Sequence, residues 1–221
     1  MCGRYTLTLD PAELQDLFGL SEPPPTGLTP RYNIAPSQSV AVVANHESRK
    51  LELFRWGLIP VWAKDPKIGN QMINARAETV AEKPAFRAAF KKRRCLILAD
   101  GFYEWKRGAT PKTPMYFQLE GGRPFAFAGL WETWTSPDRG LLHSCTIITT
   151  SANELVAPIH DRMPVILAPE AYPAWLSPGE LPAPEALGLL QPYPPAKMSV
   201  RAVSQLVNSP SHDSPECVRP M

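Results

Sequence analysis

The chain has 221 residues, of which 44% are hydrophobic and 20% charged, enough apolar material for one large soluble domain or two small ones. Its net charge of +2 is too small to indicate a nucleic-acid partner by itself, so any such binding residues must be concentrated on one face. Acidic residues interrupt the first twenty positions and no run of about 18 apolar residues exists, so we expect neither a signal peptide nor a membrane span.

Proline and cysteine usage further narrow the class of protein. The 26 prolines exceed the usual share of about 5%, which favours short segments joined by rigid turns over long helices. The cysteines are Cys2, Cys95, Cys145 and Cys217, and they have neither a C-x-x-C motif nor the spacing of zinc ligands. We therefore expect reduced thiols in a cytoplasmic protein, with no metal, no cofactor and no membrane partner.

The pattern of apolar residues predicts short strands and helices along the whole chain. Asp10-Pro11-Ala12-Glu13 supplies an N-cap, a proline at the first helical position and an acidic third residue, so a helix begins there, and it ends at Gly19. A second helix is expected to start near Pro84. The expected strands are 5–9, 39–43, 51–56, 95–99, 102–106, 114–119, 124–131, 144–149 and 164–168, and another short helix covers 169–176.

Other stretches are expected to be irregular. The sequence predicts a stiff loop over residues 23–36 and an ordered, proline-rich crossover over 178–195. The last residues are mostly Ser, Pro, His and charged, so we assign the domain to residues 1–205 and a flexible tail to 206–221. The fold class is α+β, a β-rich single domain of mainly antiparallel, barrel-like strands with short flanking helices.

A cysteine follows the initiator methionine. Removal of Met1 by an aminopeptidase would leave Cys2 with a free α-amine and a thiol, whose usual pKa values are about 7.7–8.0 and 8.5. An aldehyde condenses with such an amine to a Schiff base, and the thiol can then close on the imine carbon as a five-membered thiazolidine ring. The alternative is that Cys2 is simply the residue that followed the start codon and has no chemical role. Other residues must decide between these interpretations.

Two further positions suit proton transfer. Glu104 shares a strand face with Phe102, and a carboxylate that lies against aromatic surface has a raised pKa. His160 stands in a loop before an apolar strand, a common place for catalytic histidines. A solvated edge glutamate and a surface histidine are the structural alternatives for these two residues.

Some polar and aromatic residues suit single-stranded nucleic acid. Asn74 and Arg76 share a strand face, where an amide can hold a sugar oxygen and a guanidinium a phosphate. A capping asparagine and a surface arginine are the alternatives. Residues that would add cations or stacking surfaces to the same groove are Arg4, Arg162, Trp62 and Tyr32.

Taken together, these stretches resemble the SRAP family (SOS response-associated peptidase), whose members attach covalently to abasic sites in single-stranded DNA. The resemblance runs from residue 1 to beyond 160 in the family's order and at its approximate spacing. Each segment alone is weak evidence, whereas the combination is highly specific. The matching segments are Met1-Cys2-Gly3-Arg4-Tyr5, Arg31-Tyr32-Asn33-Ile34-Ala35-Pro36, Trp56-Gly57, Ile73-Asn74-Ala75-Arg76-Ala77-Glu78-Thr79, Asp100-Gly101-Phe102-Tyr103-Glu104-Trp105-Lys106 and Ile159-His160-Asp161-Arg162-Met163-Pro164.

The resemblance implies a role for each matched position. Cys2, exposed by loss of Met1, corresponds to the family's nucleophile, and Asn74 to the asparagine that hydrogen-bonds the ring-opened sugar. Glu104 corresponds to the proton-shuttling acid, and His160 to the histidine that assists sugar-ring opening and Schiff-base chemistry. Residues that fall where relatives touch DNA are Gly3, Arg4, Asn33, Pro36, Trp62, Arg76, Thr149 and Arg162. Some relatives carry two adjacent tryptophans where this chain has Trp62-Ala63, so one stacking wedge is missing here.

The expected function is covalent capture of abasic sites in single-stranded DNA, with AP-lyase-like Schiff-base chemistry. The expected partner is DNA, including 3′ junctions or replication forks, and the expected protein is a monomer that is cytoplasmic and nucleoid-associated if its source is bacterial. Two alternatives stay open. One is an N-terminal-nucleophile peptidase or autoprocessing hydrolase, in which the Cys2 thiolate attacks an amide with its own amine as base. The other is a single-strand binding module without catalysis.

Overall fold

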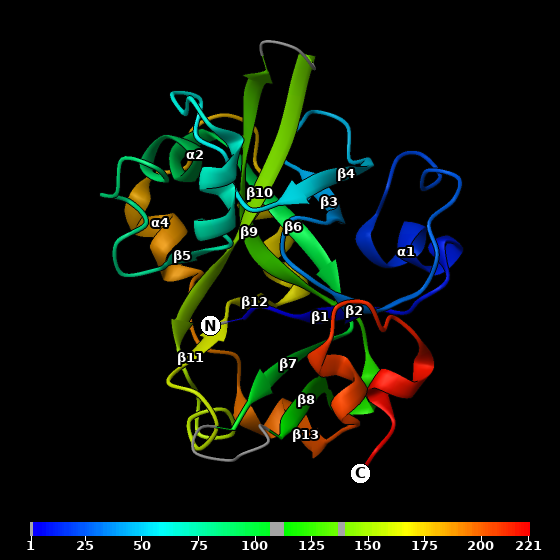
Figure 1. Ribbon diagram of the computed structural model, residues 1–221. Coiled ribbons are helices and arrows are strands. Elements are labelled where there is room, and N and C mark those ends of the chain that lie inside the picture. The colour runs from blue at the N-terminus through cyan, green and yellow to red at the C-terminus, as the bar shows by residue number, and fades with distance from the viewer. Residues whose placement is uncertain (1, 107–112, 137–139) are drawn as a thin grey trace.

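The computed structural model describes residues 2–106, 113–136 and 140–221. Its strands form two sheets, and Figure 1 shows the larger sheet above the smaller one. The smaller sheet has the strand order β13 (Met198–Ala202), β8 (Pro114–Leu119), β7 (Gly101–Trp105), β1 (Tyr5–Leu7) and β2 (Arg31–Ile34). The larger has the order β11 (Arg162–Pro164), β10 (Gly140–Ser151), β4 (Leu51–Trp56), β3 (Ser39–Ala44), β6 (Arg94–Ala99), β9 (Phe125–Ser136) and β12 (Ile166–Leu167), and β5 (Asn74–Arg76) pairs with β10.

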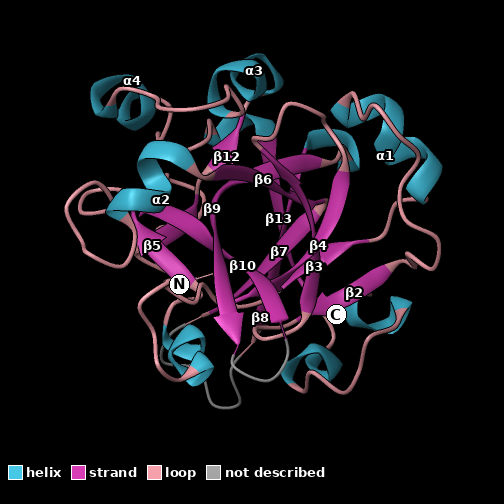
Figure 2. Cartoon of the chain, turned by 90° about the horizontal axis from the view of Figure 1, so that it is seen from above, coloured by secondary structure: helices cyan, strands magenta, loops and turns pink. Residues whose placement is uncertain are grey.

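Five strands of the larger sheet close into a barrel. They follow the order β10, β4, β3, β6 and β9, and β9 pairs back onto β10 from Ser136↔Gly140 to Gly129↔Ile147. All pairings in this ring are antiparallel except that of β4 with β10. Seen from above, the strands surround the centre and the helices lie at the periphery (Figure 2). The predicted α+β class with barrel-like, mainly antiparallel strands is therefore confirmed.

The centre of the barrel wall is β6, every residue of which is buried. It pairs with β3 along one edge and with β9 along the other, and the burial of every residue shows that both of its faces are covered, as the continuous hydrophobic pattern predicted. A Cβ atom on Gly129 would stand 2.8 Å from the Cys95 sulfur, so only glycine lets β9 cross this part of β6. The buried Arg94 guanidinium donates hydrogen bonds to the carbonyls of Trp175, Lys91 and Ser177, which satisfies its charge-bearing N–H groups.

The helices are short. The α-helices are α1 (Pro11–Phe18), α2 (Arg87–Lys92), α3 (Tyr172–Trp175) and α4 (Ala183–Gly188), and the 3₁₀ turns are η1 (Pro66–Gln71), η2 (Glu120–Gly122), η3 (Pro169–Ala171), η4 (Pro195–Lys197), η5 (Gln205–Asn208) and η6 (Pro215–Val218). Helix α1 has the predicted ends, since the Asp10 carboxylate accepts from the Ala12 N–H and Gly19 is left-handed with φ 59°. No helix in the described part of the chain is long and apolar enough to cross a membrane.

Some elements were not predicted from the sequence, among them two strands and one α-helix. Strand β2 lies inside the expected stiff loop, helix α4 inside the expected irregular crossover, and β13 in a stretch for which no element was expected. Strand β2 has only four residues and a polar sequence, so it has no periodic apolar signal of its own. Its pairing with β1 arises from tertiary contacts instead.

The structure corrects the prediction that residues 206–221 form a flexible tail. Val207 and Cys217 are fully buried in one cluster with Tyr103 and Tyr116. The segment forms η5 and η6, and Val203 makes a β-bridge with Pro220. Its serines, prolines and charged residues suggested fraying, but Val207 and Cys217 pack against the smaller sheet and Asp213 bonds to β2.

Candidate active site

The N-terminus reaches the centre of the molecule along β1. This strand lies between β2 and β7, and Tyr5 pairs with Phe102. The Tyr103 N–H donates to the Arg4 carbonyl at 3.0 Å, so the antiparallel register continues towards the chain start. Continuing it places Glu104 opposite Gly3, next to Cys2. The sheet therefore brings the predicted nucleophile and the predicted acid together across about a hundred residues of sequence.

Asn74 contacts the nucleophile directly. It begins β5, which pairs in parallel with β10 through Asn74↔Ile147. Its side-chain N–H₂ donates to the Cys2 carbonyl at 3.0 Å and to the Ile73 carbonyl at 2.7 Å. Its side-chain oxygen is buried and accepts no hydrogen bond from the described residues. The amide thus positions the main chain of Cys2 and keeps one acceptor available.

The Cys2 thiol is held in its neutral form. The side chain is fully buried, and this burial raises its pKa far above the usual value, with the negative charge of Glu104 as the next cause. A hydrogen bond from the Arg4 backbone N–H acts in the opposite direction but is the weaker influence. Glu104 is itself only 3% exposed, so its carboxylate lies in the same enclosed region. In this arrangement the thiol stays protonated and must transfer its proton when it reacts.

His160 lies before β11. Its Nδ1 is 3.0 Å from the Arg162 backbone N–H, which donates to it, and 3.0 Å from Asp161 Oδ1. Strand β11 pairs with the end of β10 through Ser151↔Arg162, and β10 pairs with β5 through Thr149↔Arg76. Because Nδ1 faces both an N–H donor and a carboxylate, these contacts do not fix the tautomer. In the neutral form that accepts from Arg162, and in the imidazolium that pairs with Asp161, Nε2 carries a proton that it can donate.

Arg162 and Thr149 are joined at the end of β10. The Arg162 guanidinium donates to the Thr149 carbonyl at 2.6 Å and makes two bonds, of 2.5 and 2.9 Å, to the carboxylate of Glu78. The hydrogen bond from Arg162 is the main cause that lowers the pKa of Glu78. Glu78 stands in the matched segment Ile73–Thr79, yet no pattern in the sequence singled it out as the partner of Arg162.

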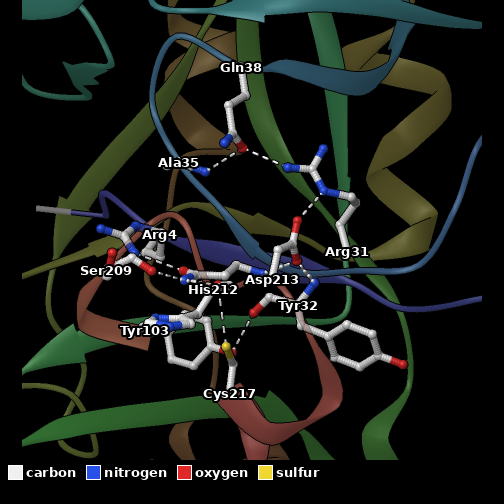
Figure 3. A network of polar contacts seen from close by, with 11 residues as sticks. Arg4, Arg31, Tyr32, Ala35, Gln38, Tyr103, Ser209, His212, Asp213 and Cys217 are labelled. Carbon is white, nitrogen blue, oxygen red and sulfur yellow. Dashed lines mark hydrogen bonds and ion pairs between the residues drawn. The ribbon is translucent and has the colours of Figure 1, made fainter. Parts of the chain in front are cut away.

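Arg4 and Asn33 have turned inward. Asn33 is fully buried, and its N–H₂ group donates to the carbonyls of Val207, Ser209 and His212. Its side-chain oxygen accepts from Arg4, which also donates to the Val207 carbonyl at 2.7 Å. Figure 3 shows Arg4 beside Ser209 and His212 of the C-terminal segment. The structure therefore corrects the assignment of Asn33 to the DNA-contacting surface, because its side chain is entirely used to anchor this segment.

Asp213 completes the anchor. Its carboxylate accepts from the backbone N–H groups of Tyr32 at 2.5 Å and Asn33 at 2.9 Å, and it pairs with the Arg31 guanidinium (Figure 3). No sequence pattern indicated this role, since Asp213 lies in the stretch expected to fray.

The remaining predicted DNA contacts stand nearer the surface. Arg76 is exposed, Gly3 and Pro36 are half-buried, and the Trp62 side chain is 56% exposed. The loop carrying Trp62 is fixed at its base, where Gly57, with φ 124°, meets Gly69 so closely that a Cβ atom would stand 2.5 Å from the Gly69 carbonyl oxygen. An exposed indole on a fixed loop is suited to stacking.

The chain is thus an α+β protein containing a five-stranded barrel, with an N-terminal cysteine set against an amide and a carboxylate. It belongs to the SRAP family, SOS response associated peptidase, whose family model matches residues 1–210.

Known proteins similar to the chain span bacteria and vertebrates. The abasic site processing protein YoqW of Bacillus subtilis is 50% identical over 222 residues, covering 99% of both chains. The abasic site processing protein HMCES of Xenopus tropicalis is 34% identical over 262 residues, covering 99% of this chain and 78% of the relative. A crystal structure of a Bacteroides thetaiotaomicron protein superposes with a TM-score of 0.89 at 28% identity, covering 100% of both chains. The family that the motifs suggested is therefore confirmed.

Proposed function

We propose that the protein captures abasic sites in single-stranded DNA covalently, through Cys2 after loss of Met1, which lies outside the described residues. The observation that carries the proposal is the convergence of two distant residues on Cys2. Asn74 donates to the Cys2 carbonyl, and the charge of Glu104 acts on the Cys2 thiol. The names of the relatives, which refer to abasic site processing, support the choice of substrate.

The reaction uses both nucleophiles of one residue. The Cys2 amine attacks the C1′ aldehyde of the ring-opened abasic sugar, and loss of one water gives an imine. The thiol then adds across the C=N bond, so that sulfur bonds to C1′ and its proton passes to nitrogen. The second bond forms within one residue, where effective molarities can reach about 10⁵ M or more. The resulting thiazolidine should therefore persist where a simple imine would hydrolyse.

Proton handling falls to Glu104 and His160. Because the environment keeps the Cys2 thiol protonated, Glu104 accepts that proton as sulfur attacks and returns it to the ring nitrogen. His160, with Nδ1 occupied by the Arg162 N–H, donates from Nε2 to the sugar oxygen during ring opening. The free acceptor of Asn74 binds a hydroxyl of the opened sugar. Together these groups serve Schiff-base formation without a metal or cofactor.

DNA is held on both sides of the reacting sugar. A base stacked on the exposed Trp62 contributes about 1–3 kcal/mol. Arg76 is exposed where β5 pairs with β10 and can meet a phosphate there, whereas Arg162 on β11 must exchange its contact with Glu78 for one. Thr149, on the strand between them, is fully buried. Phosphate contacts carry no sequence preference, which suits a lesion that occurs at any position. Gly3, Arg4 and Pro36 border the same region, with Arg4 held in place by Val207.

A pair of variants tests the proposal against the peptidase alternative. Cys2→Ala keeps the amine and loses the sulfur, so borohydride should still trap an imine with abasic DNA, whereas the heat-stable adduct of the unaltered protein should disappear. A tag left in front of Cys2 turns the amine into an amide and should abolish both products. Cleavage of a peptide by the unaltered protein, without any DNA adduct, would instead favour the N-terminal-nucleophile hydrolase.

A further inference from the structure

A groove lies between β4, η1 and the paired strands β9 and β10. Its volume is about 670 Å³, and Trp134, Leu141 and Leu142 form its apolar wall. Three cationic side chains, those of Arg55, Lys64 and Lys67, also line it, and no lining residue that the structure describes is acidic. None of the catalytic residues assigned above belongs to this groove.

The cations of the groove are available to an anion. Lys64 and Lys67 are exposed. Arg55 is half-buried and fixed, because its guanidinium donates to the Ser37 carbonyl at 3.1 Å and to the Asn70 side-chain oxygen at 3.0 Å. Both acceptors are neutral, so they hold the guanidinium in place without cancelling its charge. Asp65, between the two lysines, caps η1 by accepting from the Lys67 backbone N–H at 2.8 Å, and no described carboxylate forms an ion pair with the three cations. The groove thus keeps a net positive charge, and cations gathered on one concave surface attract a polyanion more strongly than scattered surface lysines do.

The apolar wall connects the groove to Trp62. The buried Trp134 indole donates to the Ala63 carbonyl at 2.7 Å and packs in a cluster with Ile59 and Ala63. Position 63 is where some relatives carry a second tryptophan, and here its carbonyl is the attachment point of the Trp62 loop. The groove therefore begins on the rear side of the loop that presents the exposed indole of Trp62.

The distance from the candidate active site to the groove can be estimated along strand β10. Asn74 pairs with Ile147 on this strand, whereas Arg55 pairs with Ser144 and the groove wall begins at Leu142. Five residues of extended strand span about 17 Å, at roughly 3.3 Å per residue. Successive phosphates of a helical strand advance about 3.4 Å along the axis, so the groove meets a strand a few nucleotides from the site.

We propose that this groove binds the phosphates of the DNA strand that flanks the abasic nucleotide on one side. The proposal rests on the proposed function for its location, because it takes the Cys2 site as the position of the damaged sugar. Arg55 would act as a fixed contact, and Lys64 and Lys67 as mobile ones. Binding of undamaged single strands should depend on the groove in the same way, since phosphates carry no sequence information.

The first test measures DNA binding in the absence of the crosslinking reaction. The triple variant Arg55→Gln, Lys64→Gln, Lys67→Gln is compared with a control that removes three cations elsewhere, Lys50→Gln, Arg123→Gln, Lys197→Gln. Affinity for an undamaged single strand of about 15 nucleotides, within the usual site size, is measured over a range of salt concentrations. Loss of three phosphate contacts should flatten the slope of log affinity against log salt by about 2 for the groove variant. An equal change in both variants, or none in either, would overturn the proposal.

The second test determines on which side of the abasic nucleotide the groove binds DNA. Two abasic strands of equal length carry the lesion one nucleotide from the 5′ end or from the 3′ end, so that the flank extends on one side only. The groove variant should crosslink one of these strands more slowly at low DNA concentration and the other at the unaltered rate, with equal final yields. Equal slowing on both strands contradicts a one-sided groove. Should the unaltered protein form no adduct at all, the proposed function fails, while the salt slopes still decide whether the groove binds DNA.

The two exposed positions separate DNA binding from folding. Lys64→Gln and Lys67→Gln, made singly, should each flatten the salt slope by about 0.7 while leaving the thermal midpoint unchanged. A slope that stays the same in both single variants would overturn the proposal even if the triple variant were destabilised through Arg55.

Discussion

Replacement of Asn33 by alanine is expected to loosen the C-terminal segment. The Asn33 amide donates to three carbonyls of this segment, and its oxygen accepts from the charged Arg4 side chain. Each net hydrogen bond contributes about 0.5–1.5 kcal/mol, and more where a charged group takes part. The Asn33→Ala variant leaves these partners buried without water, so we expect a loss of about 3–5 kcal/mol in the free energy of unfolding.

Urea unfolding followed by tryptophan fluorescence measures this loss, and limited proteolysis shows where the chain opens. Cleavage should appear first within residues 205–221. Tyr32→Phe is the matched control on the same strand, because Tyr32 contributes its backbone N–H and carbonyl to the network, and these remain. A loss below about 1 kcal/mol for Asn33→Ala, similar to that of the control, would refute the claim that this amide anchors the segment.

Three further predictions follow from particular residues. Burial raises the pKa of the Cys95 and Cys145 thiols above the unfolded value of about 8.5. Above that pH the unfolded chain loses protons that the folded state retains. The free energy of unfolding should therefore be constant below about pH 8.5 and fall above it by about 1.4 kcal/mol per pH unit for each thiol. Urea unfolding at pH 8 and pH 10 should show this fall, and Cys145→Val should reduce it; an unchanged slope contradicts it. Gly57→Ala should destabilise by about 2 kcal/mol or more, since its Cβ would strike the Gly69 carbonyl at 2.5 Å, whereas Gly188→Ala, with open space around it, should not destabilise in a thermal melt. Glu104→Gln removes a negative charge that raises the Cys2 pKa, so the Cys2 thiolate should form at a lower pH in an ultraviolet titration, read as the difference from Cys2→Ala. An unchanged titration would mean that the charge does not act on the sulfur.

The barrel and its strands were largely predictable because their signals are local. The continuous apolar run of β6 and the capping residues around α1 each specify an element without reference to the rest of the chain. Strand β2 and the C-terminal segment have no such signal. Polar residues of the two segments bond to each other through Asn33 and Asp213. A pairing across about 180 positions cannot be inferred from composition.

The candidate site divides in the same way. The motifs indicated Cys2, Asn74 and Glu104 as a group, and the sheet register explains how they meet. The motifs did not indicate that Asn33 is internal, because a sequence match carries no information on which way a side chain points. Glu78 was likewise missed, since its role depends on the bidentate contact with Arg162.

The most direct test of the central claim is the intact mass of the purified protein, alone and after mixing with an abasic single strand. The account predicts a protein that has lost Met1 and a heated adduct whose mass equals protein plus DNA minus one water. A protein that keeps Met1, or an adduct that survives heating when Cys2 is replaced by alanine, would contradict it.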